Sequence, residues 1–166
     1  MLSILILCTG NSARSILAEF ILNHDGRGLV QAYSAGSHPT GRPNPFALQT
    51  LKAVGIDTNN AASKSWDVFA GENAPELDLV ITVCDNAAGE TCPLFHGRGA
   101  QPAKVHWGYP DPAGVEGSDA DKAQAFADTF QALRRRIQKL LALQAQGGLE
   151  NLPVTERAAV VQAIPA

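Results

Sequence analysis

One stretch decides the fold of this chain: Leu2-Ser3-Ile4-Leu5-Ile6-Leu7-Cys8-Thr9-Gly10-Asn11-Ser12-Ala13-Arg14-Ser15. Its first part, residues 2–7, is almost wholly apolar, which is typical of a buried strand. Apolar side chains at helical spacing follow over 16–24, so a short polar loop joins a strand to a helix. Such a loop can turn successive backbone N–H groups inward, and the helix N-terminus adds unpaired N–H groups and partial positive charge. The stretch therefore predicts a cradle for an oxyanion, in which Gly10 permits a positive φ and Asn11 tolerates one.

Cys8 and Arg14 frame the loop as Cys-x5-Arg. A thiolate is a nucleophile that a nearby cation and a helix N-terminus both stabilise. The guanidinium of Arg14 offers a planar fork that matches the oxygens of a tetrahedral oxyanion, and Ser15 can donate a hydrogen bond to the sulfur. The alternative is a buried cysteine beside a solvated arginine. The place of the pair between a strand and a helix favours the functional interpretation.

The composition indicates one ordered domain. The chain has 166 residues, of which 45% are hydrophobic and 17% are charged, so it can bury a core. Its net charge is −3 without a dense Lys/Arg block, which argues against nucleic acid or an anionic membrane as the main partner. No apolar run approaches the roughly 20 residues that span a bilayer, and the N-terminus lacks a signal peptide's features. We expect a cytoplasmic protein, whose three cysteines indicate catalytic or redox use.

The rest of the chain alternates between strand and helix patterns. The expected elements are strands over 29–34, 77–83 and 104–107, and helices over 45–54, 63–69, 119–144 and 154–163. A strand, a helix and a second strand of these lengths predict a right-handed parallel βαβ unit. Arg134-Arg135-Arg136 lies between buried helical positions, so we expect these arginines on a solvated face. We expect one domain over 1–146 and a C-terminal tail over 147–166 that contains a short helix.

Two further cysteines, Cys84 and Cys92, stand eight positions apart. Cys84 follows a predicted strand, as Cys8 does, so the two sulfurs share the carboxyl edge of the sheet if their strands are neighbours. The spacing of Cys84 and Cys92 does not match the Cys-x2-Cys of a zinc site. A redox pair is the better account, and a small buried hydrophobe is the alternative. The loop over 85–102 is long, and long loops in compact domains are functional or disordered.

Several of these motifs resemble one family. The residues from Cys8 to Ser15 resemble the phosphate loop of the low-molecular-weight protein tyrosine phosphatase fold, which also serves a family of arsenate reductases. The segment over 83–93 resembles the redox segment of the three-cysteine arsenate reductases of this fold, and 106–113 resembles their acid loop. The resemblance implies an α/β domain of three layers, with a four-stranded parallel sheet flanked by helices.

The family's mechanism can be carried over to matching residues. Cys8 would attack arsenate held by the loop and Arg14, while Asp111 would protonate the leaving hydroxide. Cys84 would then attack the Cys8–arsenic adduct, which leaves a Cys8–Cys84 disulfide and releases arsenite. Cys92 would attack Cys84, and a thioredoxin-like dithiol would reduce the resulting disulfide. The oxyanion-binding loop would comprise Thr9, Gly10, Asn11, Ser12 and Ala13, with Ser15 beside Arg14.

The electron count agrees with this scheme. Arsenate reduction takes two electrons, and one dithiol-to-disulfide conversion supplies two. The expected partners are arsenate, with phosphate or sulfate as analogues, and thioredoxin or glutaredoxin; no tightly bound cofactor is expected. A disulfide needs Cα atoms within about 7 Å, so we expect the segment over 85–93 to move during turnover.

The chain departs from the family pattern at two places. Many members carry a second loop cysteine where this chain has Ala13, so a protective disulfide within the loop is impossible. Relatives often bind potassium near the loop. Asn11, Glu19 and Ser34 match three of its ligand positions, but the aspartate expected for another falls near Ser65. We therefore expect no firm metal site.

Two other functions stay open. A phosphotyrosine or phosphomonoester phosphatase would need only Cys8, Arg14, Ser15 and Asp111. Phosphatases of this fold usually carry an aromatic residue after the Asp-Pro, where this chain has Ala113, and they do not need the other two cysteines. The three thiols could also sequester arsenite or sense oxidants without turnover.

Overall fold

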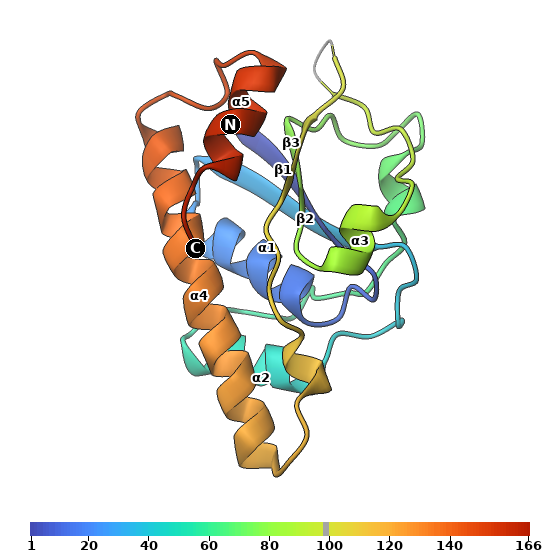
Figure 1. Ribbon diagram of the computed structural model, residues 1–166, viewed down its shortest axis with the longest axis vertical. Coiled ribbons are helices and arrows are strands. Elements are labelled where there is room, and N and C mark those ends of the chain that lie inside the picture. The colour runs from blue at the N-terminus through green and yellow to red at the C-terminus, as the bar shows by residue number, and fades with distance from the viewer. Residues whose placement is uncertain (98–99) are drawn as a thin grey trace.

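A parallel four-stranded sheet forms the centre of the computed structural model, which describes residues 1–97 and 100–166 (Figure 1). Residues 98–99 of the predicted loop 85–102 lie outside the described residues. The strands are β1 (Leu2–Cys8), β2 (Val30–Gly36), β3 (Leu79–Thr82) and β4 (Ala103–His106). They lie in the order β2-β1-β3-β4, and every pair is parallel. The predicted fold class is thereby confirmed.

Helices cover the two faces of the sheet unequally. The α-helices are α1 (Arg14–Asp25), α2 (Pro45–Ala53), α3 (Asp85–Gly89), α4 (Asp119–Ala145) and α5 (Val154–Gln162), and the 3-10 helices are η1 (Trp66–Phe69) and η2 (Pro112–Gly114). Figure 1 shows α1 and the long α4 on one side of the sheet, with α3 and the green turn of η1 on the opposite side of the picture. Among the described residues, no helix is long and apolar enough to cross a membrane.

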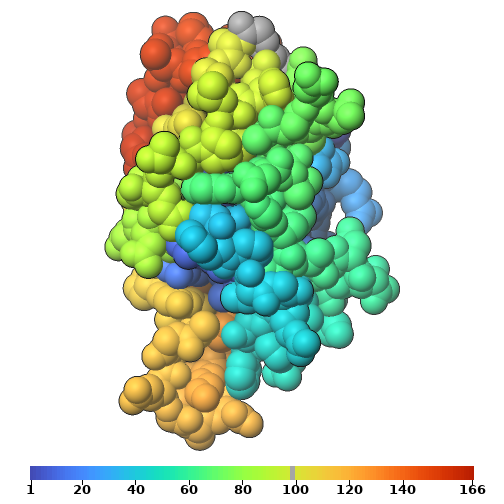
Figure 2. Space-filling view, turned by 90° about the vertical axis from the view of Figure 1, so that its right-hand side faces the viewer, coloured from blue at the N-terminus to red at the C-terminus, as the bar shows by residue number. Residues whose placement is uncertain are grey.

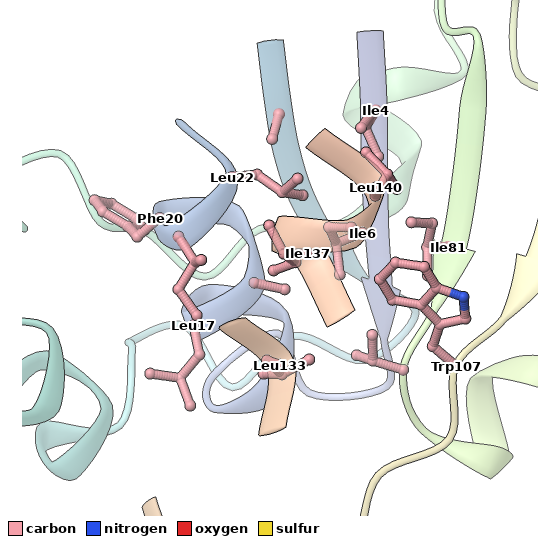
Figure 3. Close-up of a cluster of buried hydrophobic side chains, with 14 of the residues drawn as sticks. Ile4, Ile6, Leu17, Phe20, Leu22, Ile81, Trp107, Leu133, Ile137 and Leu140 are labelled. Carbon is pink, nitrogen blue, oxygen red and sulfur yellow. The ribbon is translucent and has the colours of Figure 1, made fainter. Parts of the chain in front are cut away.

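Strand β1 forms the middle of the core, because every one of its residues is buried. Ile4 and Ile6 pack with α1 and α4, whereas Leu5 and Leu7 join a second cluster that includes Phe69 on the other face. Figure 3 shows the larger cluster, in which side chains of the sheet meet those of α1 and α4. A strand that is buried on both faces carries an apolar run without alternation, which explains the N-terminal pattern.

Local capping fixes where the helices begin. Asn44 precedes Pro45 and accepts a hydrogen bond from the N–H of Phe46, so α2 begins as the sequence predicts. Ser118 begins α4 through a capping box with Asp121, in which each side chain bonds the other residue's backbone N–H.

The expectation that Arg134, Arg135 and Arg136 form a solvated face is wrong for Arg136, whereas Arg135 is exposed and Arg134 is partly exposed. Arg134 bonds Asp25 with two nitrogens, at 2.7 and 3.0 Å. Arg136 is buried, and its guanidinium carbon lies 4.4 Å from the centroid of the Trp107 ring. Helical spacing missed this because Arg136 is covered by segments distant in sequence.

The C-terminal segment packs on the sheet through α5. Val161 and Ile164 are buried, and the indole N–H of Trp107 donates to the carbonyl of Val161 at 3.2 Å. Arg157 is buried and donates to backbone carbonyls, including those of Asp78 at 3.0 Å and Leu149 at 2.8 Å. These bonds join residues beyond 147 to the edge of the sheet at β3 and β4.

Candidate active site

The loop between β1 and α1 turns its carbonyl groups outward. The carbonyls of Thr9, Gly10 and Ser12 accept hydrogen bonds from backbone N–H groups of the loop over 37–44, at 2.9, 3.0 and 2.8 Å. Because the N–H of a trans peptide points opposite to its carbonyl, the neighbouring N–H groups face the other side of the loop. Successive inward N–H groups form a concave anion site.

Asn11 sets the shape of this loop. Asn11 is fully buried. Among the described residues other than glycine it alone has a positive φ, of 45°, so Asn11 rather than Gly10 takes the left-handed conformation. Its amide nitrogen donates to the hydroxyls of Ser15 and Ser34, both at 2.9 Å, and its oxygen accepts the N–H of Lys64 at 2.9 Å. Three segments of the chain are therefore joined at one side chain.

Gly36 lets β2 approach the loop closely. A Cβ on this residue would lie 2.4 Å from the carbonyl oxygen of Thr9 and 2.9 Å from that of Cys8. We expect Gly36→Ala to lower the free energy of unfolding by about 1–3 kcal/mol, because backbone atoms must shift to make room. Urea denaturation measures this. The matched control is Gly71→Ala, where a Cβ meets open space; equal stability of the two variants would contradict the expectation.

Arg14 and Asp111 come together at the mouth of the loop. One terminal nitrogen of Arg14 donates to the carbonyl of Tyr109 at 2.7 Å, and the other lies 3.7 Å from the Asp111 carboxylate. The Nε of Arg14 is buried and has no hydrogen-bond partner among the described residues. The Asp111 carboxylate also accepts the N–H of Ala113 at 3.0 Å, which holds it at the start of η2. A cationic donor and a carboxyl group thus face the same loop.

Cys8 and Cys84 meet at the carboxyl edge of the sheet. β1 and β3 are neighbours with Leu7 opposite Thr82, and Cys84 follows β3 as the N-cap of α3. The backbone N–H of Thr9 donates to the Cys84 sulfur at 3.3 Å, and the Thr9 hydroxyl lies 3.6 Å from it. Both cysteines are buried and free. The second cysteine therefore lies against the oxyanion loop.

Cys8 and Cys84 interact strongly enough to titrate as one pair. The interaction with Cys8 lowers the pKa of Cys84 to about 5, against burial, and N–H groups of Ala87 and Thr9 also lower it. The interaction with Cys84, together with burial, raises the pKa of Cys8, although Arg14 lowers it. At neutral pH the thiolate of the pair therefore rests on Cys84.

Cys92 lies apart from this pair. It is half-buried, and its thiol donates to the carbonyl of Glu90 at 3.9 Å. Burial raises its pKa, and the Lys104 ammonium lowers it. Its side chain lines a cavity of about 400 Å³ between α3 and β4, whereas the Cys84 sulfur faces Thr9. Cys8 and Cys84 thus titrate as a pair at the oxyanion loop, whereas Cys92 lines the neighbouring cavity.

The remaining sequence-predicted residues fall into two groups. Ser15 is buried and accepts a bond from Asn11; no bond from Ser15 to a sulfur is present among the described residues. Ser34 donates to Glu19, whose pKa is raised by burial and lowered by Lys64. Asn11 presents its nitrogen to Ser34, and its oxygen accepts the N–H of Lys64. These side chains form hydrogen bonds with one another, and their oxygens do not point toward a common position. The arrangement therefore does not fit a potassium ion. The described residues contain no group of three His, Cys, Asp or Glu side chains suited to a metal.

The sequence did not single out Glu90 and His106, which also lie at this edge of the sheet. The Thr9 hydroxyl donates to Glu90 at 3.3 Å, and one Glu90 oxygen is buried without a partner among the described residues. His106 bonds Asp85 at 2.9 Å. Both contacts join segments whose adjacency depends on strand order, which hydrophobic periodicity does not supply. Figure 2 shows the resulting mouth, where blue atoms of the N-terminal part lie recessed between the yellow-green, light-blue and orange segments.

Comparison with known proteins places this geometry in context. The family model described as low molecular weight phosphotyrosine protein phosphatase matches residues 3–149. The chain is 37% identical over 134 residues to an arsenate reductase of Halalkalibacterium halodurans, which covers 81% of this chain and 91% of the relative.

Solved structures show the same fold. A thioredoxin-dependent arsenate reductase of Corynebacterium glutamicum superposes with a TM-score of 0.63 at 24% identity, over 89% of this chain and 63% of the other. A low molecular weight phosphotyrosine phosphatase of Vibrio cholerae superposes with a TM-score of 0.61 at 21% identity, over 92% of this chain and 100% of the other.

Proposed function

Since the chain belongs to the low molecular weight phosphotyrosine protein phosphatase family and is related to its arsenate reductases, we propose that it reduces arsenate to arsenite through its three cysteines. The observation that carries the proposal is the contact of Cys84 with the oxyanion loop, where its sulfur accepts the N–H of Thr9, the residue directly after Cys8, at 3.3 Å. Hydrolysis of a phosphate ester on this loop needs one cysteine. A second sulfur held against the first supports a reaction that ends in a disulfide.

Arsenate binds in the loop between β1 and α1. The inward N–H groups and the helix start stabilise its negative oxygens. Arg14 adds a guanidinium whose buried Nε has no protein partner in the described part of the chain, so it can donate to the oxyanion. The neighbouring carbonyls are held outward by the loop over 37–44, which keeps the cradle preorganised before the substrate arrives.

Cys8 makes the first bond. Its thiol loses the proton to solvent, the thiolate, which Arg14 stabilises, attacks arsenic, and a hydroxide leaves, so Cys84 keeps its own thiolate for the second step. Asp111 protonates the leaving hydroxide from the loop that precedes α4. Its side chain is half exposed and lies beside Arg14. This step forms a sulfur–arsenic bond and leaves the oxidation state of arsenic unchanged.

Cys84 makes the second bond. Its thiolate attacks the Cys8 sulfur, the sulfur–arsenic bond breaks, and the electron pair of that bond stays on arsenic. Arsenic is thereby reduced by two electrons, and the two sulfurs are oxidised to one disulfide. Because the Cys84 sulfur already lies against Thr9, next to Cys8, only a small movement precedes this step.

Cys92 makes the third bond and regenerates the Cys8 thiolate. It attacks Cys84, which frees the Cys8 thiolate and leaves a Cys84–Cys92 disulfide. Since Cys92 lies in the cavity between α3 and β4 while Cys84 faces Thr9, the segment over 85–92 rearranges before this bond closes. A thioredoxin-like dithiol then reduces the disulfide, in a compartment such as the cytoplasm that keeps thiols reduced.

A coupled assay tests this function. We expect NADPH oxidation that depends on arsenate when the protein is mixed with thioredoxin and thioredoxin reductase, and one arsenite formed per NADPH. The variant Cys8→Ser should be inactive. Absence of arsenite with both the thioredoxin and the glutaredoxin systems, together with hydrolysis of p-nitrophenyl phosphate, would identify a phosphatase and overturn the proposal.

A further inference from the structure

We propose that His106 is a positioning residue of the cysteine relay, which holds the Cys84 end of the segment over 84–92 in the reduced protein and releases it when Cys84 bonds Cys92. The proposal rests on the relay argued above and goes beyond it, because it assigns a role to side chains that touch neither arsenate nor a sulfur. It also gives α5, which lies beyond the residues matched by the family model, a part in the reaction.

The imidazole of His106 bridges the sheet and the redox segment. Its Nδ1 lies 2.7 Å from the Thr82 hydroxyl on β3, and its Nε2 lies 2.9 Å from the carboxylate of Asp85. A carboxylate only accepts hydrogen bonds, so Nε2 carries the proton and donates it. Asp85 is the residue directly after Cys84 and begins α3. A displacement of Cys84 therefore moves the partner of His106.

The backbone of His106 is fixed from the other side by α5. The side-chain amide of Gln162 accepts the N–H of His106 at 2.9 Å and donates to its carbonyl at 2.8 Å. β4 is an edge strand, so these two groups would otherwise face water. One amide pairs with them as a neighbouring strand would, and the adjacent Trp107 bonds the Val161 carbonyl. The position of the imidazole is thus set by the C-terminal helix.

The contact with Asp85 belongs to the reduced form alone. In the structure the Cys84 sulfur faces Thr9, and Cys92 lines the cavity that His106 and Gln162 also line. A Cys84–Cys92 bond requires the two Cα atoms to come within about 7 Å with their Cβ atoms facing each other. On this proposal the turn that carries Asp85 opens so that the Cys84 sulfur can leave Thr9, and the cavity beside His106 gives the segment space to enter.

A contact made only in the reduced form shifts the redox equilibrium. The contact stabilises the reduced form, so it raises the equilibrium constant for reduction of the Cys84–Cys92 disulfide by the same factor. Removing it should therefore make the Cys84–Cys92 disulfide harder to reduce. The Asp85 side chain is 92% exposed, so the expected factor is small, and a substitution there does not disturb the core.

The test is a redox titration of the full chain in a Cys8→Ser background, where Cys84 and Cys92 alone can pair. We expect Asp85→Ala to lower the equilibrium constant for reduction by dithiothreitol about threefold, which is about 14 mV for a two-electron couple. His106→Ala should lower it about fivefold. Gln162→Ala should shift it in the same direction, and the exposed control Glu72→Ala should leave it unchanged.

The double variant distinguishes a shared contact from two structural effects. The double variant Asp85→Ala/His106→Ala should match His106→Ala alone. Once His106 is replaced, the contact is already lost, so replacing Asp85 as well removes nothing further. The role of His106 would be overturned if the shifts of the two single variants multiply in the double variant. It would also be overturned if the single variants shift the equilibrium constant no more than Glu72→Ala does. If His106→Ala folds poorly, Asp85→Ala alone still provides the test. Failure of any Cys84–Cys92 disulfide to form would instead overturn the relay, and with it this proposal.

Discussion

Replacing Cys84 with serine is expected to abolish arsenate reduction, by about 10³-fold or more, while hydrolysis of p-nitrophenyl phosphate persists. Serine keeps the size of the side chain and can still accept the N–H of Thr9, so the loop should hold its shape. It cannot attack the Cys8 sulfur to form a disulfide, so the arsenic adduct is not reduced. Attack on a phosphate ester uses Cys8, Arg14 and Asp111 and does not pass through Cys84.

The two activities of the Cys84→Ser variant are measured side by side. Arsenite is quantified directly with excess thioredoxin, and p-nitrophenol release is followed in the same preparation. The rate of p-nitrophenol release serves as the internal control for folding and for an intact oxyanion loop. Reduction that continues at a tenth of the wild-type rate or more would show that another thiol performs the second step. Loss of both activities would mean that Cys84 is needed for the loop itself.

The second large effect is expected for Arg14→Lys, which should lower kcat/KM about 10²- to 10³-fold for arsenate and for p-nitrophenyl phosphate alike. Lysine keeps the charge but loses the planar fork, so a single nitrogen would have to reach both the Tyr109 carbonyl and the oxyanion. The buried Nε that has no partner among the described residues is removed altogether. Because binding and chemistry share this donor, both activities fall together.

A matched substitution controls for the loss of a guanidinium. Arg27 is exposed in the turn after α1, and Arg27→Lys makes the same chemical change away from the loop. Steady-state kinetics of both variants, with circular dichroism to check folding, decide the matter. An Arg14→Lys enzyme within threefold of wild type, or one no worse than Arg27→Lys, would remove Arg14 from the oxyanion site.

Much of the fold could be predicted from the sequence because the signals were local. An unbroken apolar run before Cys8 marks a strand buried on both faces, and that strand is β1. Pro45 after Asn44 and the capping serine of α4 mark helix starts that depend on neighbours within a few residues. The short polar loop between β1 and α1 was predicted for the same reason.

The features that were missed depend on which segments become neighbours. The order β2-β1-β3-β4 sets His106 against Asp85, and hydrophobic patterns do not encode that order. Arg136 looked solvated because its partner Trp107 lies on another element. The left-handed residue of the loop proved to be Asn11, whose buried amide satisfies three segments at once.

The most direct test of the relay is the stoichiometry of Cys92→Ser with arsenate, thioredoxin, thioredoxin reductase and NADPH. Wild type should turn over until arsenate is consumed. The variant should release about one arsenite per protein and then stop with a Cys8–Cys84 disulfide, because no thiol remains to free Cys8. Mass spectrometry of the stopped protein identifies that bond. Sustained turnover of Cys92→Ser at the wild-type rate would contradict the account, since the third cysteine would then have no part in the reaction.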